Sequence, residues 1–214
     1  MSTAVSREVA GKVRIILVAA AVLLVASSFM PLWYTEMESP QYHGDDKIVV
    51  EVYPGRLTGN LREVETLNPY IGVHLPLDAP ELRALPWVLG AFPILILGAL
   101  FAPPALQRKV LRVTFVIMAA GAIAGATALQ WRLYQLGHER THSILTRVPD
   151  FTPPIVGSLQ LKNFHVECGL ALGGWLVALA IALTAFAWYV SGLESIRLPS
   201  LAMIRHHLHV PEIR

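Results

Sequence analysis

Residues 168–193 read CGLALGGWLVALAIALTAFAWYVSGL and contain no Asp, Glu, Lys or Arg. An α-helix rises about 1.5 Å per residue, so roughly 20 apolar residues cross a hydrocarbon layer about 30 Å thick. This stretch is long enough to do so. It predicts a membrane-spanning helix in the C-terminal part of the chain.

Three further stretches lack charge in the same way: Ile15–Thr35, Ala84–Gln107 and Val113–Trp131. The whole chain of 214 residues is 54% hydrophobic and only 15% charged, which excludes an ordinary soluble domain and a disordered chain. The formal charge of +2 excludes a basic field for nucleic acid, and the single cysteine excludes a disulfide scaffold. The predicted fold class is therefore an all-α membrane protein, a bundle of four transmembrane helices with a small extracytoplasmic loop subdomain containing some β-structure.

The basic residues predict the orientation of these spans. Arg7, Lys12 and Arg14 precede the first span, and Arg108, Lys109 and Arg112 lie between the second and third. By the positive-inside rule both regions face the cytoplasm, which places the N- and C-termini inside and the protein in a bacterial cytoplasmic (inner) membrane. The expected partners are membrane lipid and other membrane or periplasmic proteins. The predicted divisions are the N-terminus with the first span (1–35), an extracytoplasmic loop subdomain (36–83), a helical hairpin (84–131), a second extracytoplasmic loop (132–167), the fourth span (168–193) and a cytoplasmic amphipathic tail (194–214).

The first span has an alternative interpretation. A basic start, an apolar run and the small residues Ala26-Ser27-Ser28 also fit a cleaved signal peptide, although the apolar run continues through Trp33. In both cases the following loop is extracytoplasmic.

The two outer loops differ in their patterns. Lys47–Tyr53 is β-branched and alternating, which predicts a strand, and Pro54-Gly55 predicts a turn after it. A short helix is expected from Asn60 to about Leu67, followed by a fixed turn at residues 68–72. The second loop contains several prolines and is expected to be irregular.

Glycines four residues apart, Gly121 with Gly125 and Gly169 with Gly173, lie on one face of the third and of the fourth predicted spans. Such faces let two helix backbones approach closely. They indicate packing within the bundle or, alternatively, docking into a larger membrane complex. No charged residue lies inside a span, which disfavours transport.

Histidines in the outer loops are the most suggestive chemical feature. His43, His74 and His138 are candidate metal ligands, because neutral imidazole binds copper and zinc. The alternative is that they are polar loop residues near a membrane surface. Cys168 could add a soft ligand for Cu(I), but a packing role is favoured for it.

The motifs of the outer loops resemble a bacterial family of small four-helix membrane proteins that accompany the assembly genes of the copper enzyme nitrous oxide reductase. The resemblance implies an accessory protein for an extracytoplasmic metalloenzyme, without catalysis of its own, that aids copper handling or assembly. It covers most of the chain through the fourth span. It rests on Pro40, Gln41, Tyr42, Asn68, Tyr70, Gly72, Gly137, His138, Pro154, Gly157 and Asn163.

The sequence departs from the family at one motif. Pro69 and Val73 stand where the family pattern commonly has His and Met, so copper binding cannot be carried over at those positions. His138 matches, and His74 or His43 would have to assist it. The alternative function is a structural, non-catalytic subunit of a membrane redox or oxygenase complex.

Overall fold

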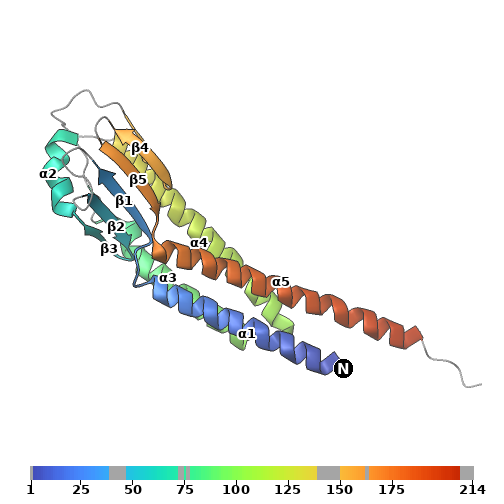
Figure 1. Ribbon diagram of the computed structural model, residues 1–214. Helices are drawn as coiled ribbons and strands as arrows, with labels where there is room; N and C mark the ends of the chain where they lie inside the picture. Colours follow the sequence, from blue (N-terminus) through green and yellow to red (C-terminus); the bar gives the residue numbers. More distant parts are fainter. Residues whose placement is uncertain are drawn as a thin grey trace, which may run out of the picture.

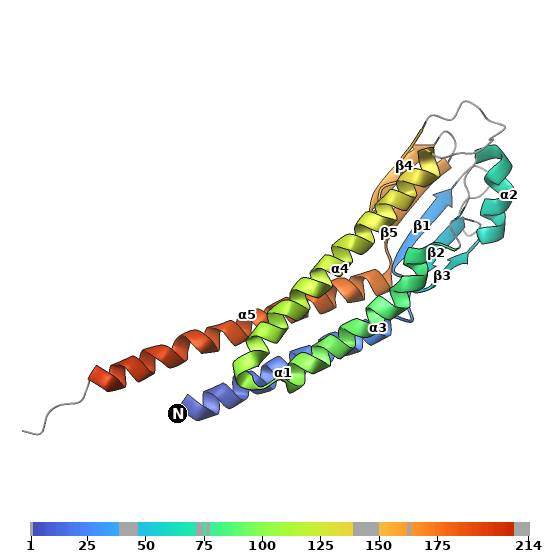
Figure 2. The same cartoon turned by 180° about the vertical axis from the view of Figure 1, so that it is seen from behind.

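The computed structural model describes residues 2–38, 47–71, 75, 78–138, 150–161 and 164–207. Long helices run side by side, and a β-sheet stands at one end of them (Figures 1 and 2). The elements, in chain order, are α1 (Ser2–Ser27), β1 (Trp33–Glu38), β2 (Ile48–Tyr53), β3 (Arg56–Gly59), α2 (Leu61–Ile71), α3 (Pro80–Phe101), α4 (Pro104–His138), β4 (Gly157–Leu161), β5 (Phe164–Leu170) and α5 (Leu172–His207).

The helix bundle has an almost wholly apolar interior. α1 packs against α3 and α5, and α4 packs against both α3 and α5. Leu17, Ile96, Met118 and Ala180 are fully buried where these helices meet. The buried Thr184 hydroxyl donates to the backbone carbonyl of Ala180 at 2.8 Å, so this polar group is satisfied inside its own helix.

The sheet is antiparallel, in the order β3-β2-β1-β5-β4. The central strand β1 and its neighbour β5 are continuous with the bundle, because β1 follows α1 and β5 runs directly into α5. Two backbone hydrogen bonds fasten this junction: Gly173 N–H donates to Pro31 at 2.8 Å and Ala171 N–H to Leu32 at 3.2 Å. The sheet is therefore tied to the helices through residues that the sequence assigns to the first and fourth spans.

Strand alternation gives the sheet one apolar face. Trp33 and Met37 of β1 and Val166 and Cys168 of β5 share this face. The end of α4 covers part of it through a cluster that includes Leu133. α2 covers the rest, with Val64 packed on Ile48 and Val50, and Figure 2 shows α4 in front of this side of the sheet.

The prediction of an all-α bundle with four transmembrane helices is wrong. Among the described residues, three helices are long and apolar enough to cross a membrane: Pro80–Phe101, Leu106–His138 and Leu172–Gly192. The predicted first span, Ile15–Thr35, divides instead, because α1 ends at Ser27 and β1 begins at Trp33. Its uncharged helical part, Ile15–Ser27, is only about 20 Å long at 1.5 Å per residue.

The prediction that the second loop is irregular is also wrong for its C-terminal half, which forms β4 and β5. β5 includes Cys168, so α5, the helix of the predicted fourth span, begins at Leu172 rather than at Cys168. In the first loop, the predicted strand is confirmed as β2, and Gly55 has the positive φ of 85° that its turn requires. The expected short helix is present as α2, but it continues to Ile71, so residues 68–71 are helical rather than a turn.

The predicted glycine face of the fourth span is wrong, because Gly169 lies in β5 and only Gly173 lies in α5. The other glycines are only partly used for packing inside the molecule. A Cβ at Gly121 would lie 3.0 Å from the ring of Phe92, and one at Gly173 would lie 2.7 Å from the carbonyl oxygen of Pro31. Glycine is therefore required at position 173, where the contact is with backbone, whereas at position 121 the Phe92 ring would have to shift slightly. A Cβ at Gly125, in contrast, would meet no other described part of the chain within 4 Å.

Candidate functional site

The second face of the sheet, which we call the polar face, carries charged and hydroxyl side chains. No helix of the described part of the chain crosses it, as Figure 1 shows. The strand register assigns its residues by alternation. The polar ones are Tyr34, Glu36, Glu38, Glu51, Tyr53, Arg56, Thr58, Ser158, Gln160, His165 and Glu167.

Carboxylates crowd the centre of the polar face. Glu36 on β1 lies directly opposite Glu167 on β5. Like charges in directly opposed positions destabilise a sheet. Lys47 relieves this repulsion, because its Nζ lies 3.8 Å from Glu36 Oε2 and 3.5 Å from Glu38 Oε2. The carboxylate of Glu38, with smaller contributions from Glu36 and Glu167, raises the pKa of Lys47 and keeps its ammonium charged.

His165 links the carboxylates to the edge strand β4. Its Nε2 lies 3.3 Å from Glu167 Oε1, and its Nδ1 lies 3.1 Å from Gln160 Oε1. Both partners are oxygens, so a doubly protonated imidazolium can donate to both at once, whereas a neutral ring donates to one. The polar face thus combines carboxylates, an ammonium and a titratable ring within one layer.

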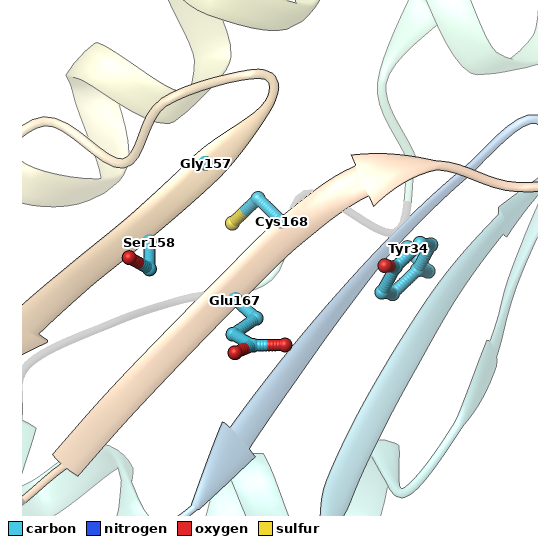
Figure 3. Close-up of a pocket in the computed structure, with 5 residues that line it drawn as sticks. All are labelled: Tyr34, Gly157, Ser158, Glu167 and Cys168. Atoms are coloured by element: carbon cyan, nitrogen blue, oxygen red, sulfur yellow. The ribbon is translucent and has the colours of Figure 1, made fainter.

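A hollow of about 280 Å³ opens beside this cluster, lined by Tyr34, Gly157, Ser158, Glu167 and Cys168. Figure 3 shows the hydroxyl end of Tyr34 pointing from β1 toward β5, with Ser158 on the neighbouring edge strand. Two glycines stand next to the hollow, Gly157 in its lining and Gly169 beneath Tyr34. The phenol of Tyr34 lies over Gly169, where a Cβ would be 3.0 Å from its ring, and Gly157 has a φ of 132°.

Cys168 contributes to packing rather than to the polar face. It is buried with Trp33, Leu133 and Val166, and its thiol donates to Thr35 Oγ1 at 3.4 Å. Burial raises the pKa of this thiol, and the hydrogen bond with Thr35 offsets part of the rise. A thiol held in its neutral form is a poor ligand for a metal and a poor nucleophile.

Of the three predicted metal ligands, the structure describes His138. It is the last residue of α4 and lies at the end of the molecule where the sheet stands. Its Nδ1 lies 3.0 Å from the backbone carbonyl of Tyr134, which can only accept a hydrogen bond. Nδ1 therefore carries the proton, and in the neutral ring Nε2 keeps a lone pair that can bind a metal. The ring also stacks on Tyr134, with centroids 3.9 Å apart, and Tyr134 stacks on Trp131 at 5.7 Å.

The other predicted ligands, His43 and His74, lie outside the described residues. Their distance from His138 therefore stays untested. Within the described ranges, no group of three His, Cys, Asp or Glu side chains could hold a metal ion. His138 alone supplies one imidazole ligand, which is fewer than a stable copper site needs.

Several of the motif residues build the fold. Gly137 is in close contact with the backbone carbonyl of Phe151, so no side chain fits there. The segment from Phe151 onward is then tied to the sheet, because Trp33 Nε1 donates to the Ile155 carbonyl at 2.7 Å. A Cβ at Gly157 would lie 3.6 Å from Pro154 Cγ, in ordinary contact. These positions hold the second loop against α4 and the sheet.

The remaining motif residues are described in part or not at all. Asn68 and Tyr70 lie in α2, and their side chains are not among those described. Outside the described residues lie Pro40, Gln41, Tyr42, Gly72 and Asn163.

The polar face itself was missed by sequence reasoning. Its signal was the alternation of apolar and polar residues in Trp33–Glu38 and Phe164–Leu170. No family model matches the chain, and a search of curated proteins finds no match. The geometry of the sheet and of the helices is therefore the ground for any functional proposal.

Proposed function

We propose that this protein is a membrane-anchored accessory protein of an extracytoplasmic metalloenzyme, with the sheet as its working end. The observation that carries the proposal is the position of the sheet. It stands at one end of the three apolar helices and is built from both segments that connect them to each other and to α1 (Figures 1 and 2). A rigid platform beyond a membrane anchor suits holding a partner.

Charge and aromatic residues support an orientation with the sheet outside a bacterial inner membrane. The first turns of α4, at the end away from the sheet, carry Arg108 and Lys109, and cytoplasmic regions are rich in such residues. At the sheet end, the three apolar helices expose Trp87 by 82%, Trp131 by 58% and Trp175 by 62%. Exposed tryptophans favour the boundary between lipid and water. In this orientation the end of α5 away from the sheet faces the cytoplasm.

The metal assigned to this function is copper, on the basis of the family resemblance and of His138. The free Nε2 of His138 offers one ligand on the sheet side of the membrane. Further ligands would come from His43, His74 or the partner enzyme. The protein in this proposal assists copper handling or assembly and performs no catalytic step.

Titration of the purified full-length protein with Cu(I), in the presence of a reductant and a competing chelator, tests the metal role. The wild type is expected to bind Cu(I) and the His138→Ala variant to bind it at least tenfold more weakly. His165→Ala is the matched control, because His165 lies on the polar face with both ring nitrogens near oxygens. Equal binding by wild type and His138→Ala would remove copper from the proposal.

A structural subunit of a membrane redox or oxygenase complex is the second candidate, and one observation favours it. Residues 122–127 of α4 are exposed on every side, and a Cβ at Gly125 would meet no other described part of the chain. A small-residue segment of this kind allows another transmembrane helix to pack closely. Native electrophoresis after extraction in mild detergent decides this candidate: a large complex supports it, and migration as a single 23.5 kDa chain contradicts it.

A further inference from the structure

The polar face has an unbalanced charge. Four glutamates lie on it, Glu36, Glu38, Glu51 and Glu167, and the strands and their ends contribute Lys47 and Arg56 as described cations. Arg56 is turned over the ring of Tyr53, with its guanidinium carbon 5.3 Å from the ring centroid. The carboxylates thus outnumber the cations, and the face as a whole is acidic.

The contacts of Lys47 show that the carboxylates of the polar face bind an ammonium group. One ammonium lies within 4 Å of two carboxylates of the same strand. Glu167 lies on the next strand, and its one ion-pair partner among the described residues is His165. The His165 ring is charged only when it is protonated. The row from Glu36 to Glu167 therefore has room for a second cationic group.

The hollow lies where that second group would enter. Its rim offers the carboxylate of Glu167 and the hydroxyl oxygens of Tyr34 and Ser158, all of which accept hydrogen bonds from an ammonium or guanidinium. The volume and the acceptor set fit the end of a lysine or arginine side chain.

We infer that the polar face binds a basic segment of an extracytoplasmic protein, with one lysine or arginine side chain of that segment seated beside Tyr34, Ser158 and Glu167. The inference rests on the proposed orientation, because it takes the partner from outside the cytoplasm. The proposed accessory function does not specify which kind of protein is bound, and this inference specifies a protein with a basic segment. Charge complementarity of this kind mainly sets the specificity and the rate of association.

Binding of a fluorescent hexalysine peptide to the full-length protein in nanodiscs of neutral lipid tests the inference. Fluorescence anisotropy at low salt gives the affinity. The double variant Glu36→Gln/Glu167→Gln is expected to bind the peptide about tenfold more weakly than the wild type. The matched control is Glu63→Gln/Glu65→Gln, which removes the same charge from exposed positions on α2, away from the polar face, and is expected to change the affinity by less than about twofold.

A second pair of variants separates the hollow from the general charge of the face. Ser158→Arg places a guanidinium in the hollow, whereas Thr58→Arg adds the same charge to the polar face on β3, away from the hollow. The first is expected to weaken hexalysine binding at least fivefold more than the second. Because Ser158 is exposed, this change leaves the apolar face intact.

Three results would overturn the inference: no saturable binding to the wild type, equal losses in the two double variants, or displacement of the peptide by calcium at an ionic strength at which sodium has no effect. The last would assign the face to a metal cation. The assay is independent of copper and of orientation, because both sides of a nanodisc are accessible. Peptide binding without Cu(I) binding would therefore keep this inference and remove the metal role.

Discussion

Replacing Trp33 with phenylalanine tests how the second loop is held to the sheet. Trp33 is only 5% exposed, and its indole nitrogen donates to the Ile155 carbonyl at 2.7 Å. Phenylalanine removes the donor, leaves a part-buried carbonyl unpaired at a cost of about 1–3 kcal/mol, and leaves a small void. The expected loss of local stability is about 2–3 kcal/mol.

Hydrogen–deuterium exchange of the protein in nanodiscs measures this loss directly. Because about 1.4 kcal/mol corresponds to a factor of ten, amides of β5 such as that of Val166 are expected to exchange roughly 30 to 150 times faster in Trp33→Phe. Trp175→Phe is the control, since Trp175 is 62% exposed and its replacement is expected to cost no more than about 0.5 kcal/mol. Unchanged exchange of the β5 amides in Trp33→Phe would refute this account of the loop.

Two further predictions concern single positions of the sheet end. Gly137→Ala is expected to lower the midpoint of thermal unfolding by several degrees, because the added methyl group collides with the Phe151 carbonyl. Gly125→Ala adds its methyl group in open space and should leave the midpoint nearly unchanged. Equal midpoints for the two variants would contradict the contact between Gly137 and Phe151. Cys168 in the folded protein is expected to react with iodoacetamide more slowly than in detergent-denatured protein at neutral pH, and its rate should go on rising with pH after that of a free thiol has levelled off. Since its folded pKa is raised, the free energy of unfolding should fall as the pH increases through the ordinary thiol range, and identical rates in folded and denatured protein would contradict the raised pKa.

The apolar helices were predictable because an uncharged run of about 20 residues has few other stable environments. β2 was predictable from its β-branched alternation. β1 was not, because Trp33–Thr35 continues the uncharged run of α1 without a break, and hydrophobicity alone does not distinguish the end of a helix from the start of a half-buried strand. β5 was hidden in the same way, since Cys168–Leu170 lacks charge and joins the run of α5.

The candidate site depends on pairing across more than a hundred residues of sequence. Glu36 and Glu167 are adjacent only because β1 pairs with β5, and the hollow beside Tyr34 needs both of these strands and β4. Single-sequence patterns carry no register between distant strands, so the polar face could not be assembled from them. The histidines drew attention because their chemistry is visible residue by residue, and His138 does lie at the sheet end of α4.

The central claim, that the sheet stands outside the cytoplasm at the end of a membrane anchor, is tested most directly by cysteine labelling in intact bacterial cells. In a Cys168→Ser background, Ser158→Cys places a thiol on the polar face, and Ala102→Cys places one between α3 and α4 at the opposite end. A membrane-impermeant maleimide is expected to label Ser158→Cys in intact cells and Ala102→Cys only after the membrane is disrupted. Labelling of Ala102→Cys from outside, with Ser158→Cys protected, would contradict the account.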